Sequence, residues 1–310
     1  MKIAIIGAGA IGLYYGAMLQ RAGHEVMFLL RGDYEAIMTT GLTVFSYNGD
    51  FHLDQVRGFR DTESMGSVDL VLVCLKTFDN RFMVDLVRPL FSDKTAVLTL
   101  QNGLGNEELL SKAFSSERVL GGIAQIGCNR GKSGTVHHLA HGTIRIGEFN
   151  GGLSDRLEKI SEMFNASGVK SVPEADIKHI RWEKLVWNIP FNGLCALSGA
   201  TPGELLAHPL SLQMVKSLMI EVIEAAATQG LQITPDKEQY IEALLTRTKK
   251  MGDYRPSMMI DRLEGRPLEL DSIYGTPIRH AKLNGFEMTR VEMLYALLEL
   301  GNRSGPALQN

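Results

Sequence analysis

The pattern of apolar and polar positions divides the chain into two parts. In the first part, short aliphatic runs such as Lys2–Ile6 and Val68–Leu75 alternate with helical patterns. This alternation predicts a doubly wound parallel sheet. From Asp176 onward the strand-like runs disappear, and apolar residues recur at helical spacing. We therefore expect an α/β fold, with a Rossmann-type domain over residues 1–172, an all-α domain over residues 173–310, and the active site in the cleft between them.

The same patterns predict the individual elements. An Asn48-Gly49-Asp50 turn predicts a hairpin between its flanking runs. We expect Phe78–Leu90 to form one crossover helix, and Thr135–Leu139 and Gly142–Gly147 to form two antiparallel strands. The other predicted strands are His24–Leu30, Leu42–Tyr47, Phe51–Val56, Thr95–Leu100, Val119–Ile126 and Val169–Pro173. The other predicted helices are Leu13–Arg21, Tyr34–Thr40, Asn106–Ala113, Leu153–Asn165, Ile180–Leu197, Leu210–Gln229, Asp236–Lys250, Asp271–Asn284 and Thr289–Glu299.

Composition narrows the possible partners and the compartment. The net charge is −3 and there is no basic run, so nucleic acid and anionic membrane surfaces are not expected partners. Every apolar stretch is shorter than the ~20 residues of a membrane span. The three cysteines form no C-x-x-C pair, which indicates a reducing compartment. Met1-Lys2 leads directly into the first strand, so we expect a cytoplasmic protein. We expect its oligomeric state to be either a monomer or a homodimer.

A glycine-rich turn follows the first predicted strand. The turn consists of Gly7, Ala8, Gly9, Ala10, Ile11 and Gly12, a G-x-G-x-x-G pattern. In such a turn the first glycine permits the tight bend, the second lets a pyrophosphate approach, and the third lets the helix pack closely on the sheet. Strand, turn, helix and second strand occur here in the order that a dinucleotide site requires. The alternative is an ordinary strand-to-helix turn in another α/β protein.

Arg31 ends the second predicted strand and indicates which dinucleotide binds. NAD-selective sites carry an acid there for the ribose 2′-hydroxyl, whereas an arginine accommodates a 2′-phosphate. The nearest acid is Asp33. We therefore expect NADP(H), the alternative being that Arg31 is a solvated surface charge.

The sequence also contains a histidine cluster, His137-His138-x-x-His141. Adjacent histidines in a strand point to opposite faces, and no nearby acid or cysteine completes a tetrahedral set. We expect no metal site.

One predicted helix carries three polar residues among large apolar ones. Lys184, Asn188 and Asn192 have i, i+4, i+8 spacing, which places them on one stripe. Such a stripe either faces a bound ligand or lies on the solvent-exposed surface. Downstream, Pro256 before Ser257 predicts a helix start, and Glu269 opens the next helix after a Gly-x-Pro turn. Both are typical helix-terminus residues, so spacing alone leaves their role open.

Taken together, these motifs resemble the ketopantoate reductase (2-dehydropantoate 2-reductase) family. The residues that carry the resemblance are the glycine turn with Arg31, Leu75-Lys76, Gln101-Asn102-Gly103, Trp182-x-Lys184-Leu185-x-x-Asn188-x-x-x-Asn192, Ser257 with Asp261, and Glu269-x-Asp271-x-Ile273-x-Gly275. The resemblance implies reduction of 2-dehydropantoate to (R)-pantoate with NADPH, in pantothenate and coenzyme A biosynthesis.

The resemblance also implies roles for individual residues. Lys184 would be the general acid, Asn188 and Asn192 would hold the substrate, and Ser257 would bind its carboxylate. Asn102 would touch both the nicotinamide ribose and the substrate. Glu269 would hydrogen-bond the cofactor, and Lys76 and the backbone near Gly127 would line the cofactor cleft.

Two positions depart from the family pattern. Pro202 and Tyr254 stand where family members often carry asparagine. Their replacement removes amide donors, so a reductase of another branched 2-oxo acid is one alternative. A non-catalytic NADP(H)-binding sensor is another, although a sensor has no use for a proton donor such as Lys184.

Overall fold

The computed structural model describes residues 1–303. By its internal contacts the chain forms two compact units. The first, here called the sheet unit, comprises Met1–Gln101 and Asn106–Ile177. The second, the helical unit, comprises Asn102–Gly105 and the chain from Lys178 onward. The boundary expected between residues 172 and 173 falls inside a strand, Ser171–Glu174, that pairs with the sheet.

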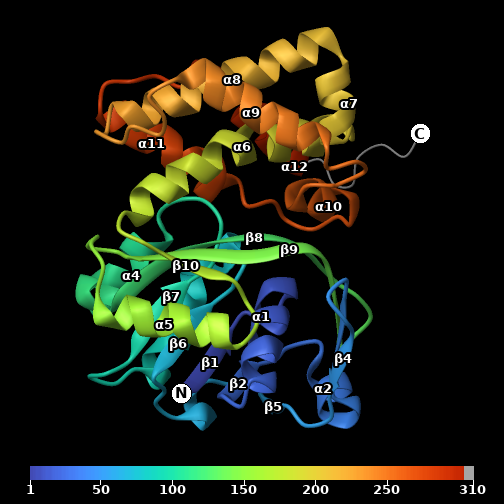
Figure 1. The fold of residues 1–310 in the computed structure, drawn as a ribbon, viewed down its shortest axis with the longest axis vertical. Helices are drawn as coiled ribbons and strands as arrows, with labels where there is room; N and C mark the ends of the chain where they lie inside the picture. Colours follow the sequence, from blue (N-terminus) through green and yellow to red (C-terminus); the bar gives the residue numbers. More distant parts are fainter. Residues whose placement is uncertain (304–310) are drawn as a thin grey trace. The chain divides into compact units, whose positions relative to one another are not determined.

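The sheet unit contains one ten-stranded mixed sheet. Its strands β8 and β9 lie side by side in Figure 1. The strand order is β4-β3-β9-β8-β7-β6-β1-β2-β5, and β10 also pairs with β9. Strands β8, β7, β6, β1, β2 and β5 are mutually parallel, which is the Rossmann-type part of the sheet. The expected α/β class is therefore confirmed. The strands are β1 (Lys2–Ile6), β2 (Glu25–Leu29), β3 (Leu42–Ser46), β4 (Phe51–Leu53), β5 (Arg57–Phe59), β6 (Leu70–Val73), β7 (Ala96–Thr99), β8 (Val119–Arg130), β9 (Thr135–Glu148) and β10 (Ser171–Glu174).

Helices cover both faces of this sheet because its strands are apolar on both sides. Ile3 and Ile5 of β1 pack with α1 and α5, whereas Ala4 and Ile6 pack into a second core with α3 and α4. The helical elements of this unit are α1 (Ala10–Arg21), α2 (Tyr34–Thr40), η1 (Glu63–Met65), η2 (Thr77–Phe82), α3 (Met83–Val87), η3 (Arg88–Leu90), α4 (Asn106–Phe114), η4 (Ser116–Arg118) and α5 (Asp155–Ala166).

Two of the expected elements in this unit differ from the structure. The expected helix Phe78–Leu90 is divided into η2, α3 and η3. Pro89 has no N–H to donate to the carbonyl of Asp85, which interrupts the α-helical hydrogen bonds. The segments expected as two paired strands form the single strand β9, which pairs with β8. Positive φ at His141 (61°) and Gly142 (121°) turns the chain locally without ending the strand.

The histidines of the cluster have structural partners in the sheet unit. His138 is buried, its Nε2 lies 2.8 Å from the carbonyl oxygen of His141, and its Nδ1 lies 3.0 Å from Ser46 Oγ. The ring of His137 stacks on Phe45. Within residues 1–303, no group of three or more histidines, cysteines or acids could hold a metal ion.

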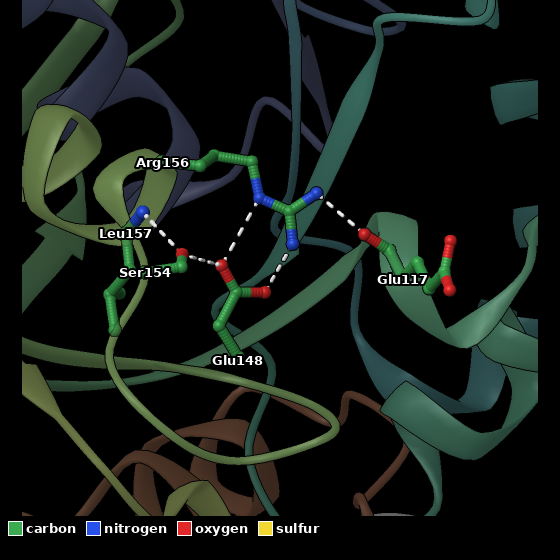
Figure 2. Close-up of polar contacts among 5 residues, drawn as sticks. All are labelled: Glu117, Glu148, Ser154, Arg156 and Leu157. Atoms are coloured by element: carbon green, nitrogen blue, oxygen red, sulfur yellow. Dashed lines mark hydrogen bonds and ion pairs between the residues drawn. The ribbon is translucent and has the colours of Figure 1, made fainter.

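A buried carboxylate joins the end of β9 to the start of α5 (Figure 2). Glu148 accepts hydrogen bonds from Ser154 Oγ at 2.5 Å and from Arg156 Nε at 3.1 Å. Ser154 is the N-cap of α5 and accepts from the N–H of Leu157. Arg156 also donates to the carbonyl of Glu117 at 2.7 Å. Because both oxygens of Glu148 and all three nitrogens of the Arg156 guanidinium have partners, this network fixes the helix on the sheet.

The helical unit is built around α6, and its described residues contain no strand. Trp182, Val186 and Ile189 of α6 are buried in one apolar core with residues of α8, α9 and α12. Pro190 lies inside α6. No helix within residues 1–303 is both long and apolar enough to cross a membrane. The helical elements are α6 (Ile177–Ser198), α7 (Pro202–Ala207), α8 (Pro209–Ala227), α9 (Lys237–Lys249), α10 (Ser257–Leu263), the π-helix η5 (Asp271–Gly275), α11 (Thr276–Leu283) and α12 (Thr289–Arg303).

Candidate active site

The glycine turn between β1 and α1 leaves space for a ligand at its centre. Gly7 has a φ of +104°, and a Cβ there would lie 2.5 Å from the carbonyl carbon of Cys74. A Cβ at Gly12 would collide with the carbonyl oxygen of Gly7. Gly9 differs, because its φ of −83° suits any residue and no protein atom lies within 4 Å of a Cβ built there. The fold therefore requires Gly7 and Gly12, whereas the space at Gly9 is left open.

The N-terminus of α1 begins at this open space. Gly9 is its N-cap and supplies no side chain to bond the first-turn N–H groups, and the first turn contains no acid. Free N–H groups and the positive end of the helix dipole attract phosphate. An open space beside an uncapped helix N-terminus is compatible with the pyrophosphate site that the sequence pattern predicts.

Arg31 and Asp33 follow β2 and have different environments. Arg31 is exposed, and its guanidinium lies 3.4 Å from Asp79 of η2. Asp33 is buried and pairs with Arg130 at the end of β8. The charge of the Asp33 carboxylate is therefore already balanced within the protein, whereas the Arg31 side chain is open to solvent.

Lys76 and Gly127 belong to different strand regions of the sheet unit. Lys76 follows β6 and is the N-cap of η2, directly after the Cys74–Leu75 backbone that the glycine turn approaches. Gly127 lies at an irregularity in the pairing of β8 with β9. The adjacent Cys128 donates from Sγ to the carbonyl of Ala10 at 3.5 Å. The residues next to Lys76 and Gly127, though far apart in sequence, thus approach the glycine turn and the start of α1 respectively.

Three side-chain amides fix the chain on both sides of Asn102. Gln101 donates to the carbonyl of Leu75 at 3.0 Å and to Asn80 Oδ1 at 2.7 Å. Asn80 in turn donates to Asn106 Oδ1 at 2.8 Å. The loop that carries Asn102 therefore begins after β7 and ends at α4, and hydrogen bonds fix the chain at both of its ends.

Lys184, Asn188 and Asn192 do share one stripe of α6. Asn188 and Asn192 are buried, and Lys184 is partly buried. Lys184 Nζ donates to Asn102 Oδ1 at 2.8 Å. The stripe is therefore not a surface face, because two of its three polar residues are almost fully covered by protein.

The loop Asn102–Gly105 is anchored within the helical unit. Leu104 is buried in the helical core and its N–H donates to the carbonyl of Ser272 at 2.9 Å. Gly103 has a φ of +79°, and any side chain there would collide with the backbone of Ser272. This close approach holds Asn102 beside Lys184.

Burial and two neighbouring charges determine the pKa of Lys184. The pKa of Lys184 is lowered from 10.5 to about 7, mainly by burial and to a smaller extent by the positive charge of Arg181. Glu269, also buried, opposes both effects. A group whose pKa lies near neutral pH can both donate and accept a proton, which suits general acid–base catalysis.

Asn192 connects the stripe to the start of α10. Its Oδ1 accepts a hydrogen bond from the N–H of Met258 at 3.4 Å. The preceding residue, Ser257, is exposed at the beginning of this helix. The helical unit thus brings together Lys184, Asn102 and Glu269 at one end of the stripe, and Asn192 and Ser257 at the other.

Two charged residues near these groups were not singled out from the sequence. Arg181 is buried one helical turn before Lys184, and its i−3 spacing is a signal that the sequence contains. Asp79 lies beside Arg31, but forty-eight residues separate the two and no pattern links them.

A Rossmann-type sheet with a glycine-rich turn before α1, together with a lysine of near-neutral pKa in a helical unit, is typical of an oxidoreductase that uses a nicotinamide dinucleotide. Comparison with known families specifies it further. The family description "Ketopantoate reductase PanE/ApbA" matches residues 3–151, and "Ketopantoate reductase PanE/ApbA C terminal" matches residues 176–302. The chain belongs to the ketopantoate reductase family.

Individual relatives match over almost the whole chain. A 2-dehydropantoate 2-reductase of Nostoc sp. strain PCC 7120 is 40% identical over 98% of this chain and 97% of its own length. The crystal structure of 2-dehydropantoate 2-reductase from Geobacter metallireducens GS-15 is 52% identical, with a TM-score of 0.94, over 97% of this chain and 100% of that one. The ternary structure of D-mandelate dehydrogenase with NADH and anilino(oxo)acetate is 25% identical, with a TM-score of 0.90, over 98% and 99% of the two chains.

Proposed function

We propose that the protein reduces 2-dehydropantoate to (R)-pantoate with NADPH. The observation that carries the proposal is the Lys184 ammonium, hydrogen-bonded to Asn102 and with a pKa near 7. The names of the Nostoc and Geobacter relatives support this substrate.

Lys184 acts as the proton donor in this proposal. The cofactor, when bound, supplies a hydride to the keto carbon. Negative charge then develops on the carbonyl oxygen, where an ammonium both stabilises it and delivers the proton. Asn102 accepts one N–H of Lys184 and so orients the others. Glu269 helps to keep the lysine protonated.

The remaining residues bind and orient. The glycine turn holds the pyrophosphate through Gly7, Ala8, Gly9, Ala10, Ile11 and Gly12. Lys76 and Gly127 also belong to the cofactor site. Arg31 binds the 2′-phosphate, because a guanidinium matches phosphate with two parallel hydrogen bonds. Asn188 and Asn192 offer amide donors to the substrate. The exposed Ser257 hydroxyl accommodates its carboxylate.

The pH dependence of reduction should follow the protonation of Lys184. The donor is the protonated form, which predominates below its pKa, so kcat/KM should be constant below pH 7 and fall above it. The pKa of Lys184 is about 7. Well above this pH, kcat/KM should fall by about tenfold for each further pH unit. Initial rates between pH 5.5 and 9.5, at limiting keto acid, measure it.

Glu269→Gln provides the control for this profile. Glu269 raises the pKa of Lys184, so its removal should move the break in kcat/KM to lower pH. A profile without a break between pH 6 and 9 in the wild type would refute the assignment of Lys184.

Arg31→Ala tests the choice of cofactor. If Arg31 binds the 2′-phosphate, the substitution should lower kcat/KM for NADPH by about tenfold or more while leaving that for NADH almost unchanged. Kinetics with both cofactors measure the two ratios. Equal activity with NADPH and NADH in the wild type would contradict NADP(H) specificity.

One observation favours a second candidate substrate. The rings of Trp187 and Tyr254 lie 6.2 Å apart, and Trp187 adjoins Asn188 on α6. An aromatic pair in place of an amide side chain favours a larger apolar group on the 2-oxo acid. D-mandelate dehydrogenase, from the same set of structural relatives, has anilino(oxo)acetate in its ternary complex.

A panel of 2-oxo acids separates these candidates. NADPH oxidation is followed with 2-dehydropantoate, with other branched 2-oxo acids and with an aryl 2-oxo acid. The proposal predicts the highest kcat/KM with 2-dehydropantoate. Preference for another acid would establish the second candidate, and no turnover with any acid would leave only a sensor.

A further inference from the structure

The guanidinium of Arg31 has a carboxylate beside it. Arg31 NH1 donates to Asp79 Oδ2 at 3.4 Å, which is long for a charged hydrogen bond. The Arg31 side chain is 63% exposed, whereas that of Asp79 is only 22% exposed. The arginine is therefore held loosely, and the acid is the more firmly placed member of the pair.

The backbone explains why Asp79 stays in place. Asp79 lies in the first turn of η2, and its N–H donates to the carbonyl of Lys76 at 2.9 Å. The next residue, Asn80, is bonded to both Gln101 and Asn106. A shift of the Asp79 backbone would disturb this network, whereas the exposed Arg31 side chain can rotate into solvent.

The other acid near Arg31, Asp33, has a different ion-pair partner from Asp79. Asp33 is buried, and Arg130 neutralises it from the end of β8. Asp79 has Arg31 as its ion-pair partner. A phosphate that takes the guanidinium from this pair leaves the Asp79 carboxylate near its own negative charge.

We propose that Asp79 sets the degree of preference for a 2′-phosphorylated cofactor, by competing with the 2′-phosphate for Arg31. This inference rests on the proposed role of Arg31. A 2′-phosphate carries nearly two negative charges and is repelled by Asp79, whereas an unmodified ribose is neutral and is not. Asp79 therefore weakens NADPH binding more than NADH binding, and so reduces the ratio of the affinities for NADPH and NADH.

Asp79→Asn removes the charge and keeps the shape of the side chain. We expect the ratio of affinities for adenosine 2′,5′-bisphosphate and adenosine 5′-monophosphate to rise about three- to tenfold. The ratio of kcat/KM for NADPH and NADH should rise in parallel. Asp79→Glu keeps the charge and should leave both ratios close to those of the wild type.

Asp85→Asn is the matched control, because Asp85 is an exposed acid on the neighbouring α3 and its loss changes the net charge equally. Calorimetry with the two adenosine nucleotides gives the affinities without any turnover. An unchanged or lower ratio in Asp79→Asn would overturn the inference. Arg31→Ala separates this inference from the proposed function. If Arg31→Ala leaves the nucleotide ratio unchanged, the role of Arg31 fails and the inference fails with it. If Arg31→Ala lowers the ratio and Asp79→Asn leaves it unchanged, only the inference is overturned.

Discussion

Replacement of Lys184 by alanine should lower kcat by at least about 100-fold, the lower end of what general acid catalysis contributes. The variant loses both the proton donor and the positive charge at the developing oxyanion. Cofactor affinity should change little, because the residues proposed to hold the dinucleotide lie mainly in the turn between β1 and α1. Steady-state kinetics with 2-dehydropantoate and NADPH, together with a cofactor binding titration, measure both quantities.

Two further substitutions make this experiment specific. Lys184→Arg keeps the positive charge but replaces the acid by a guanidinium, which scarcely gives up its proton. It should preserve KM better than alanine does and still show a low kcat. Lys282→Ala, at an exposed position of α11, should retain wild-type kinetics. A Lys184→Ala enzyme within a few-fold of the wild type would disprove the assignment.

Gly9→Ala should weaken dinucleotide binding without affecting the fold. The backbone of Gly9 suits any residue, and a Cβ there meets no protein atom within 4 Å. The added methyl group would instead occupy the space into which we expect the pyrophosphate to fit. We predict an increase of about tenfold or more in the Kd for NADPH, with Tm unchanged.

Gly7→Ala provides the contrast. Its φ of +104° and its approach to the Cys74 carbonyl carbon leave no room for a side chain. This variant should lose at least about 2 kcal/mol of unfolding free energy. Thermal denaturation and a cofactor titration on both variants test the pair. A Gly9→Ala protein that binds NADPH normally would show that the open space serves another purpose.

The sequence predicted those elements whose signals are local. The hydrophobic run of β1, the glycine turn and α1 follow one another within twenty-one residues, and the structure confirms all three. The hairpin at Asn48-Gly49-Asp50 is likewise confirmed as β3 paired with β4. In these segments the local preference and the tertiary contacts favour the same conformation.

Other elements depend on contacts that one segment does not encode. β5 has only three residues and exists because it pairs with β2. The continuity of β9 through His141 and Gly142 depends on pairing with β8. By contrast, α7 carries a local signal in its sequence, since Thr201 and Glu204 form a capping box at its start.

The candidate site shows the same difference between local sequence signals and long-range contacts. Spacing along one helix predicted that Lys184, Asn188 and Asn192 share a stripe. It did not predict whether the stripe is buried, nor that Asn102, eighty-two residues earlier, accepts a hydrogen bond from Lys184. The lowered pKa of Lys184 arises from burial and from Arg181 and Glu269, and so depends on the folded helical unit.

The most direct test of the proposed reaction follows the transferred hydrogen. NADPH carrying two deuterium atoms at C4 of the nicotinamide is oxidised by the purified protein in the presence of 2-dehydropantoate, and the product is identified by mass spectrometry and chiral chromatography. We predict (R)-pantoate with one deuterium at C2 for each NADPH consumed. Absence of labelled pantoate, under conditions where the protein binds NADPH, would contradict the proposed reaction.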